Sequence, residues 1–441
     1  MNALPIAAPE AEELLAPLAS FPRVALAVSG GPDSIALMFL ARRRRGARAE
    51  GPSLIALTVD HGLRPESRAE AEQVGRLASR LGLPHVILTW ERQGPHAAGL
   101  QERAREARYA LMAGYCHAHD IPAIVTAHTL DDQAETLLMR LKRGSGLDGL
   151  AAIPPRGEWA GIALLRPLLD VPKARLLATL EAEGIGYISD PSNRDLRFER
   201  ARLREQSEAL AALGLDAEAI ALSARRLRRA REALDNAARD FLAAHSDVSE
   251  AGYALIDKDA LFAAADEIAL RALAQTIAAI GGGAEPLRLA KLEALLAALH
   301  AHPDKGHTLG RCRIVPLKGK LGIFRETRAS GLPVTRLHPG EQALWDNRFH
   351  IALGAAEPAA VQVRALGETG LRLLKERKAW PSSLPALAGR TLPSCWRGET
   401  LLGLPKLGRT LPPETAGVDC RAVFVGAKAG FSGGTAEDLA R

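Results

Sequence analysis

The chain has 441 residues, which is too many for one ordinary hydrophobic core, so a single small domain is excluded and two or three domains are expected. Hydrophobic residues make up 47% of the chain and aromatic residues only 4%, a balance that provides packed cores and favours helices rich in Ala and Leu. The net charge of +6, carried mainly by arginine, suits a nucleic-acid partner, and a genomic bias toward arginine explains it equally well.

Several classes of protein are disfavoured by what the sequence lacks. The four cysteines form no C-x-x-C pair and no zinc-ligand spacing; they are Cys116, Cys312, Cys395 and Cys420. The first 20 residues contain acids and no basic residue, unlike a signal peptide. No uncharged apolar run approaches the roughly 18 residues that a membrane span needs. We therefore expect a reduced cytoplasmic protein without a membrane partner.

The first 150 residues alternate between apolar strands and helical segments. Strands are predicted, in chain order, at 23–28, 53–60, 85–90 and 121–128, and helices at 33–45, 67–81, 98–118 and 130–142. This alternation is typical of a parallel sheet covered by helices on both faces. Ligands of such sheets bind at the carboxyl ends of the strands, where this chain has Ser29, Asp60 and His128. Four arginines, 42–45, end the first helix and fit ordinary helix-end chemistry, with nucleic-acid contact as the alternative.

The pattern changes twice farther along the chain. From about 205 to 300 the sequence is rich in Ala, Leu and Arg and has almost no strand signal, and from about 308 short strands return with many Pro and Gly residues. We expect an α/β parallel-sheet nucleotide-binding domain, a helical middle domain, a mixed α+β C-terminal domain and a disordered tail. Their expected bounds are 1–210, 211–305, 306–430 and 431–441.

The motif with the clearest chemistry lies between the first strand and the first helix. It consists of Ser29, Gly30, Gly31, Pro32, Asp33 and Ser34. Glycines let the backbone approach an anion, the helix N-terminus directs N–H groups at it, and the two serines add donors. Asp33 would repel a phosphate by itself, and it fits if it holds a magnesium ion that bridges to the phosphates. The sequence therefore predicts an ATP phosphate site with Mg²⁺.

A plain turn is the alternative interpretation of this motif. No Lys follows the glycines, so the loop is not a Walker loop, and it is not G-x-G-x-x-G either. Glycines also serve turns with positive φ, and an Asp also caps a helix. The string SGG recurs at 432–434, where no strand precedes it and no Asp follows two residues later, so we interpret that copy as chance.

A second polar cluster begins at the end of the fourth strand and enters the following helix. Asp132 and Glu135 are three residues apart and therefore share a helix face, while His128 lies just before them. Acids at a helix start also complement the helix dipole, which explains one acid but not the whole cluster. Two separated acids, Asp33 and Asp132, are predicted to chelate one Mg²⁺.

These strings resemble a known family. SGGPDS after the first strand looks like the PP-loop of N-type ATP pyrophosphatases, which cleave ATP to AMP and pyrophosphate. Within that superfamily, the ordered set resembles the tRNA(Ile)-lysidine synthetases over about residues 23–205. The matching segments are Val59–Arg64, Ala104–Tyr109, Ala127–Thr136, Arg143–Leu150 and Asp190–Asn193, followed by Arg200 and Arg204. Leu373–Arg377 and Thr400–Pro405 are similar to the family's C-terminal tRNA-binding domain.

The resemblance implies a PP-loop fold and a reaction. ATP, L-lysine and the wobble cytidine of the CAU-anticodon isoleucine tRNA would give lysidine, AMP and pyrophosphate through an adenylated cytidine. Asp132, Glu135 and His128 are candidates to bind and deprotonate the lysine ammonium. Arg108, and after it Arg200, are candidates to stabilise charge at the α-phosphate.

The chain departs from the family pattern at two positions. Many members have His-His where this chain has His128-Thr129, and many have Arg-Asn where it has Arg200-Ala201. We therefore assign the active role to His128 and none to position 129, and we expect the loop near 201 to differ.

Two rival functions remain. The first is a tRNA thiolase of the PP-loop class, which generally carries paired cysteines or an iron–sulfur site, whereas Cys116 stands alone in this domain. The second is a tRNA-binding protein with an inactive nucleotide fold, against which the intact Asp33 and Asp132 pair argues.

A surface for tRNA is expected outside the catalytic domain. Arg225, Arg228 and Arg229 lie in an arginine-rich helix of the middle domain. A solvated helix face in an arginine-rich chain is the alternative interpretation. The sequence leaves the tRNA identity elements and the oligomeric state open, and a homodimer is one option.

Overall fold

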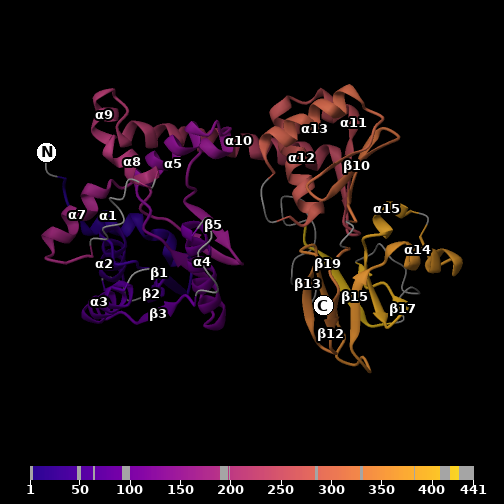
Figure 1. The fold of residues 1–441 in the computed structure, drawn as a ribbon, viewed down its shortest axis with the longest axis horizontal. Helices are drawn as coiled ribbons and strands as arrows, with labels where there is room; N and C mark the ends of the chain where they lie inside the picture. Colours follow the sequence, from indigo (N-terminus) through magenta and orange to yellow (C-terminus); the bar gives the residue numbers. More distant parts are fainter. Residues whose placement is uncertain are drawn as a thin grey trace. The chain divides into compact units, whose positions relative to one another are not determined.

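A computed structural model describes residues 3–46, 51–62, 65–91, 100–188, 197, 199–283, 287–327, 331–381, 383–407 and 418–426. The chain forms two compact units, Met1–Arg231 and Glu232–Arg441, which are drawn in Figure 1. Leu63, Arg64, the segment 190–193 and the tail 431–441, all considered above, lie outside the described residues.

Unit 1, Met1–Arg231, is built on a six-stranded sheet. The strand order is β3-β2-β1-β4-β6-β5, in which all neighbours are parallel except β5 against β6. The bounds are β1 Arg23–Ala27, β2 Ser53–Asp60, β3 His85–Thr89, β4 Ala123–Val125, β5 Arg156–Trp159 and β6 Ile162–Leu165. The four strands and the parallel α/β fold predicted from the sequence are confirmed, and the hairpin β5–β6 extends the sheet beyond them.

Helices cover both faces of this sheet. The helices that lie wholly or partly in unit 1 are α1 Ala8–Leu14, α2 Pro32–Gly46, α3 Ser67–Arg80, α4 Leu100–Ala118, α5 Leu130–Lys142, α6 Leu147–Leu150, α7 Lys173–Ala182, α8 Glu199–Glu205, α9 Ser207–Ala212 and α10 Ala217–His245, with a 3₁₀ turn at Ala16–Ser20. Successive residues of β1 point to opposite faces. Leu26 packs with α2, α3 and α7, and Ala25 packs with Met112 of α4. Burial on both faces explains why the strands read as continuous apolar runs.

The arginine run at the end of α2 is tied to its own chain. Arg42 donates from Nε to the carbonyl of Leu81 at 2.8 Å, and Arg43 donates from Nη2 to the carbonyl of Ile6 at 2.9 Å. Arg44 is buried and pairs with Glu12. These contacts support the helix-end interpretation of the run over nucleic-acid contact.

Unit 2, Glu232–Arg441, contains three sheets with the orders β7-β8-β11-β10-β9, β12-β15-β16-β17 and β13-β14-β19-β18. Its strands are β7 Ser246–Ser249, β8 Tyr253–Asp257, β9 His307–Leu309, β10 Cys312–Leu317, β11 Lys320–Arg325, β12 Thr335–Leu337, β13 Gln342–Trp345, β14 Phe349–Leu353, β15 Val361–Ala365, β16 Pro393–Arg397, β17 Thr400–Gly403, β18 Lys406–Leu407 and β19 Cys420–Phe424. Its helices are α11 Lys258–Ala263, α12 Asp266–Gly281, α13 Leu289–Ala301, α14 Gly367–Glu376 and α15 Ala386–Gly389.

The structure differs from the expected domain plan in this half. β7 and β8 lie inside the segment 211–305 that was expected to be helical, and β8 pairs with β11 beyond residue 305. The short strand β8 alternates between buried and half-buried positions, but it is flanked by long Ala- and Leu-rich helices that dominate the sequence pattern. The compact units also divide within α10, after Arg231, rather than at 210.

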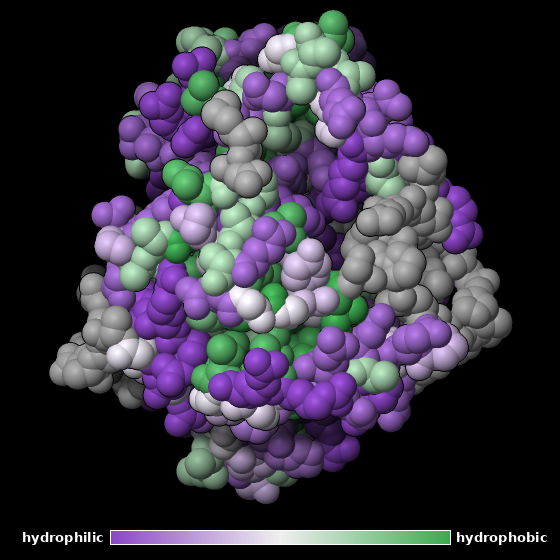
Figure 2. All heavy atoms as spheres, turned by 90° about the vertical axis from the view of Figure 1, so that its left-hand side faces the viewer, coloured by the Kyte–Doolittle hydropathy of each residue, from purple (hydrophilic) through white to green (hydrophobic). Residues whose placement is uncertain are grey.

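Among the described residues, no helix is long and apolar enough to cross a membrane. On the face drawn in Figure 2, hydrophobic residues are interspersed with hydrophilic ones.

Candidate active site

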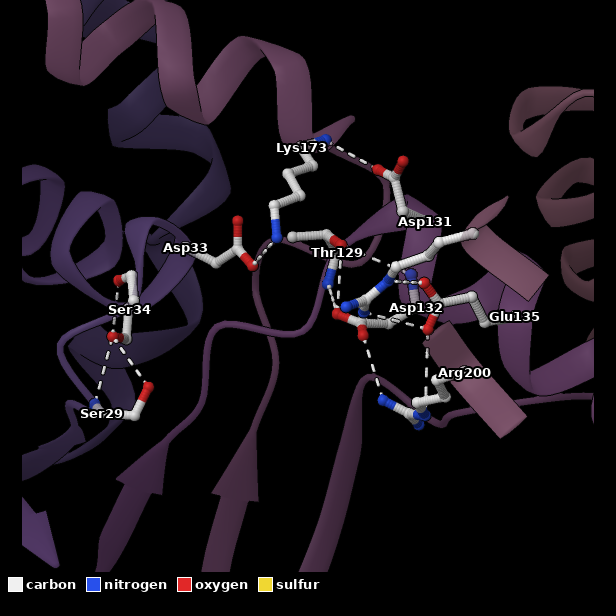
Figure 3. Close-up of polar contacts among 11 residues, drawn as sticks. Ser29, Asp33, Ser34, Thr129, Asp131, Asp132, Glu135, Lys173 and Arg200 are labelled. Atoms are coloured by element: carbon white, nitrogen blue, oxygen red, sulfur yellow. Dashed lines mark hydrogen bonds and ion pairs between the residues drawn. The ribbon is translucent and has the colours of Figure 1, made fainter. Parts of the chain in front are cut away.

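The SGGPDS loop follows β1 at the carboxyl edge of the sheet of unit 1. Ser34 Oγ accepts a hydrogen bond from the Ser29 backbone N–H at 3.1 Å and donates to the Gly31 carbonyl at 2.9 Å. Gly30 has φ of +91°, and a Cβ there would lie 2.7 Å from Cδ1 of Ile188. Glycine is therefore required at this position for its backbone conformation and for space. Hydrogen bonds within the loop therefore hold its shape, and the loop leads into the N-terminus of α2 at the edge of the sheet (Figure 3).

Asp33, in the first turn of α2, has one paired and one unpaired oxygen. Its Oδ2 lies 3.1 Å from Nζ of Lys173, and its Oδ1 is buried without a hydrogen-bond partner among the described residues. Burial raises the pKa of Asp33, Lys173 opposes that rise, and the nearby carboxylates of Asp132 and Asp131 add to it. A half-buried carboxylate with a free oxygen and acidic neighbours is suited to bind a cation.

Asp132 is fixed by the start of α5. Thr129 caps this helix, and Oδ2 of Asp132 accepts hydrogen bonds from the Thr129 backbone N–H at 2.9 Å and from its hydroxyl at 3.1 Å. Oδ1 of Asp132 accepts from Arg200 at 3.2 Å. Thr129, for which no role was predicted, thus completes a capping box that orients Asp132.

Glu135 lies one turn farther along α5. It is buried, and it accepts hydrogen bonds from Nε of Arg204 and, at 3.2 Å, from Nη2 of the same guanidinium. Burial raises the pKa of Glu135, and the contact with Arg204 opposes that rise. Arg204 therefore provides the positive charge that a buried carboxylate requires.

His128 lies just before this helix and has its Nδ1 2.8 Å from the hydroxyl of Thr126. Burial lowers the pKa of His128 to about 4, against the opposing effect of Asp132, and the positive charges of Arg166 and Arg200 lower it further. The imidazole is therefore neutral at pH 7.

Arg108 stands apart from these groups, in a second cluster at the end of β2. Its Nη2 lies 3.0 Å from Nε2 of His61. Burial and the charge of Arg108 lower the pKa of His61 to about 4. Asp60, the last residue of β2, accepts from Ser67 at 2.6 Å and from the Gly62 N–H at 3.0 Å. Arg108, the first candidate for the α-phosphate, thus contacts His61, whereas the second candidate, Arg200, contacts Asp132.

A cavity of about 210 Å³ joins three of the six predicted catalytic residues. Its polar end includes Asp33, Asp132 and Glu135, together with Lys173 and Arg204. Its other wall is apolar and is formed by Leu138, Leu203, Leu210, Leu215 and Ile220. The structure thus brings together the two acidic motifs, which lie about 100 residues apart in the chain.

A magnesium ion fits the donor set in part. No group of three or more His, Cys, Asp or Glu residues among those described is arranged to hold a metal. Mg²⁺ is usually bound by one or two carboxylates together with waters and substrate phosphates, and Asp33 with Asp132 meets that lesser requirement because Oδ1 of Asp33 is unpaired.

Comparison with known proteins identifies the family. A PP-loop domain family matches residues 5–208. A tRNA(Ile)-lysidine synthase of Bradyrhizobium sp. (strain BTAi1 / ATCC BAA-1182) is 50% identical over 304 residues, which cover 67% of this chain and 84% of that protein. The synthase of Ruegeria pomeroyi is 40% identical and covers 88% of this chain and 89% of that protein. The chain belongs to the tRNA(Ile)-lysidine synthase family. As a member of this family it is an ATP-using ligase of the PP-loop class.

Among solved structures, the U34-tRNA thiolase NcsA from Methanococcus maripaludis, with its [4Fe-4S] cluster, is 17% identical with a TM-score of 0.43, covering 50% of this chain and 79% of that chain. A likeness of this size carries no functional argument. The family assignment instead disfavours the thiolase alternative, and the resemblance to lysidine synthetases drawn from the sequence is confirmed.

Two residues of the site were missed from the sequence. Lys173 was not considered, although it is one of only two lysines in residues 1–231, the other being Lys142. Arg204 was noted only as part of the family pattern. The rarity of lysine in this arginine-rich half of the chain is the one signal that could have identified Lys173.

Proposed function

We propose that this protein ligates L-lysine to C2 of the wobble cytidine of the CAU-anticodon isoleucine tRNA, through an adenylated cytidine, with release of AMP and pyrophosphate. The observation that carries the proposal is the cavity in which Asp33 of the SGGPDS loop, the acids of α5 and Arg204 of α8 meet, in a chain of this family. Such a substrate also places the protein in the cytoplasm.

ATP binding is assigned to the loop. The SGGPDS backbone and the N-terminus of α2 bind the phosphates and stabilise the leaving pyrophosphate. Asp33 and Asp132 would hold Mg²⁺ beside them, and a bound magnesium ion supplies charge neutralisation for the phosphates. Arg108 or Arg200 stabilises the charge that develops at the α-phosphate.

Lysine binding is assigned to the mixed cavity. Lysine carries an ammonium at each end of an aliphatic stem and a carboxylate at one of those ends. Asp132 and Glu135 attract the ammonium groups, while Arg200 and Arg204 offer partners to the carboxylate. Leu138 and Ile220 supply apolar contact for the stem. The ε-ammonium must lose a proton before it attacks C2, and Asp132, Glu135 and His128 are the candidates to accept it.

Binding of tRNA beyond the reacting base is assigned to α10. Arg225 and Arg229 are exposed there, and Arg228 is half-buried. Arginines of this kind position a nucleic acid through its phosphates and do not read its bases.

Sulfur transfer fits this site poorly. Cys116 is the single cysteine in residues 1–231. It is completely buried, and burial raises the pKa of its thiol to about 11. A thiol of that kind stays protonated and is a poor nucleophile.

The test is pyrophosphate release from ATP with the CAU-anticodon isoleucine tRNA, with and without lysine, and with the methionine tRNA as control. We expect release of AMP and pyrophosphate together with incorporation of lysine into the isoleucine tRNA only. Equal incorporation into both tRNAs, or none with either, would contradict the proposal.

A further inference from the structure

Lys173 is held beside the phosphate loop by its main chain. It is the first residue of α7, and its backbone N–H donates to Oδ2 of Asp131 at 2.8 Å. Helix α7 packs on α2 through Leu176 and Leu180, which share a core with Leu37. Since α2 carries Asp33, the position of the Lys173 main chain is fixed relative to the SGGPDS loop.

The side chain of Lys173, in contrast, has room to change partners. It is 34% exposed, and its ammonium lies 3.1 Å from Oδ2 of Asp33 (Figure 3). A lysine presents a compact charge on a flexible four-carbon stem, whereas an arginine presents a rigid fork. Unit 1 uses arginine almost throughout and has lysine at only two positions, one of which faces this carboxylate.

The charges around Asp33 give the ammonium two competing positions. Asp131 and Asp132 lie close enough to raise the pKa of Asp33, so this end of the cavity attracts cations and would repel a polyphosphate. A divalent cation on Asp33 repels the Lys173 ammonium, and a phosphate chain on the neighbouring loop attracts it. Both effects move the ammonium from the carboxylate toward the phosphates.

We propose that Lys173 is a pyrophosphate-binding residue that exchanges partners: its ammonium pairs with Asp33 until a divalent cation takes that carboxylate, and it then binds the β- and γ-phosphates of ATP and the leaving pyrophosphate. The inference rests on the proposed function for the identity of the anion. No bond forms or breaks in this exchange. Lys173 thus contacts the leaving pyrophosphate in addition to the backbone of the SGGPDS loop.

The exchange predicts two effects of opposite sign in Lys173→Gln, both measured without tRNA or lysine. Inorganic pyrophosphate, titrated calorimetrically at saturating Mg²⁺, should bind about ten- to a hundredfold more weakly, because one charge-assisted hydrogen bond is lost. Mn²⁺, titrated alone and followed by electron paramagnetic resonance, should bind more tightly, because the competing ammonium is gone. A merely structural lysine would weaken both.

Two further variants complete the test. Lys173→Arg keeps the charge and should recover most of the pyrophosphate affinity. Lys142→Gln removes the only other lysine of unit 1, which is exposed and pairs with Glu199, and should change neither titration. Wild-type pyrophosphate affinity in Lys173→Gln, or weaker or unchanged Mn²⁺ binding in that variant, would overturn the proposal. Failure of the proposed function would appear in a different experiment, the assay with tRNA and lysine, where the wild-type protein would not incorporate lysine into the isoleucine tRNA.

Discussion

Nη1 of Arg200 lies 3.2 Å from Oδ1 of Asp132, across 68 residues of sequence. One turn later on each helix, Arg204 contacts Glu135 in the same way. The two pairs connect α5 and α8 in register. Both carboxylates are largely buried, so each arginine is needed for its acid to remain charged in place. The arginines of α8 therefore determine the electrostatics of the cavity as much as the acids do.

Glu135→Gln tests the proposed lysine site. Removing one partner of a desolvated pair typically costs about 2–5 kcal/mol, and the amide leaves the guanidinium of Arg204 without a counter-charge. We expect the KM for lysine to rise more than the KM for ATP, measured by initial rates at saturating concentrations of the other substrates.

Glu199→Gln is the matched control for that variant. Glu199 belongs to α8 as well, and it pairs with Lys142 and Arg143, which are exposed. Exposed pairs contribute little, so both KM values should stay near those of the wild type. An equal rise of both KM values in Glu135→Gln would show that Glu135 is structural.

Asp33→Asn tests the metal site. The substitution removes the charge that would bind Mg²⁺ and keeps the shape of the side chain. We expect turnover to fall by orders of magnitude, while the free energy of unfolding changes by less than about 1 kcal/mol, because the lost ion pair with Lys173 is partly exposed. Turnover at several Mg²⁺ concentrations and urea denaturation measure the two effects. Full activity at millimolar Mg²⁺ would contradict the assignment.

His61 and His128 predict a pH dependence of stability. The pKa values of His61 and His128 fall from about 6.5 in the unfolded chain to about 4 in the fold. Between these values the unfolded chain binds more protons, so stability is complete above about pH 6.5 and decreases as the pH falls toward 4.

His128→Gln isolates one of these contributions. The difference between the denaturation midpoints at about pH 7.5 and about pH 5 should be smaller in the variant than in the wild type, since a glutamine does not titrate. An unchanged difference would mean that His128 titrates near its ordinary value in the fold.

The catalytic half of the fold was predictable because its signals are local. Residues 23–28 and 53–60 are apolar runs at the spacing of a β-α-β unit, and both are strands of the parallel sheet. β8 was missed because its hairpin with β7 is short and lies between the long Ala- and Leu-rich helices α10 and α12, whose pattern dominates this stretch. Its other partner, β11, lies more than 60 residues away and leaves no local pattern.

The same limit applies to the site. Asp33 and Asp132 follow strand ends and could be placed at one edge of the sheet from the sequence alone. Lys173 and Arg204 reach the cavity because α7 and α8 pack beside it. Their spacing in the sequence from Asp33, Asp132 and Glu135 gives no sign of this. No role was predicted for Thr129 because many family members have His at this position. In the structure its hydroxyl caps α5.

The buried charges of unit 2 predict a separate stability effect. Asp346 accepts hydrogen bonds from Arg325 at 3.0 and 2.9 Å and from Arg348 at 2.6 Å, and Arg348 is completely buried. Both guanidiniums hold the pKa of Asp346 below its usual range despite burial.

Asp346→Asn should therefore destabilise unit 2 by about 3–5 kcal/mol, because two buried cations lose their counter-charge. ATP binding in unit 1 should be retained. The exposed pair of Arg364 and Glu399 gives a control, Glu399→Gln, which should cost less than about 1 kcal/mol. Limited proteolysis together with denaturation assigns the loss to unit 2, and equal effects of the two variants would contradict the prediction.

The final prediction concerns the tRNA surface of α10. Arg225 and Arg229 are exposed, and the ion pair of Arg225 with Asp170, at 3.5 Å, is itself exposed. Replacing both with Gln should weaken binding of all tRNAs alike and reduce the slope of log affinity against log salt by up to about two phosphate equivalents. ATP affinity should not change. Arg228 is half-buried, so Arg228→Gln should act mainly on stability.

Arg23 provides the control for this salt titration. It is exposed at the amino end of β1 and donates to the carbonyl of His119 at 2.9 Å, at the edge of the sheet opposite the SGGPDS loop. Arg23→Gln removes one positive charge from the protein without touching α10. If general charge attraction governs tRNA binding, Arg23→Gln and Arg229→Gln will lower the salt slope equally. If α10 contacts phosphates directly, only Arg229→Gln will lower it, by about one phosphate equivalent. A wild-type slope in the double variant would exclude this helix and direct attention to unit 2.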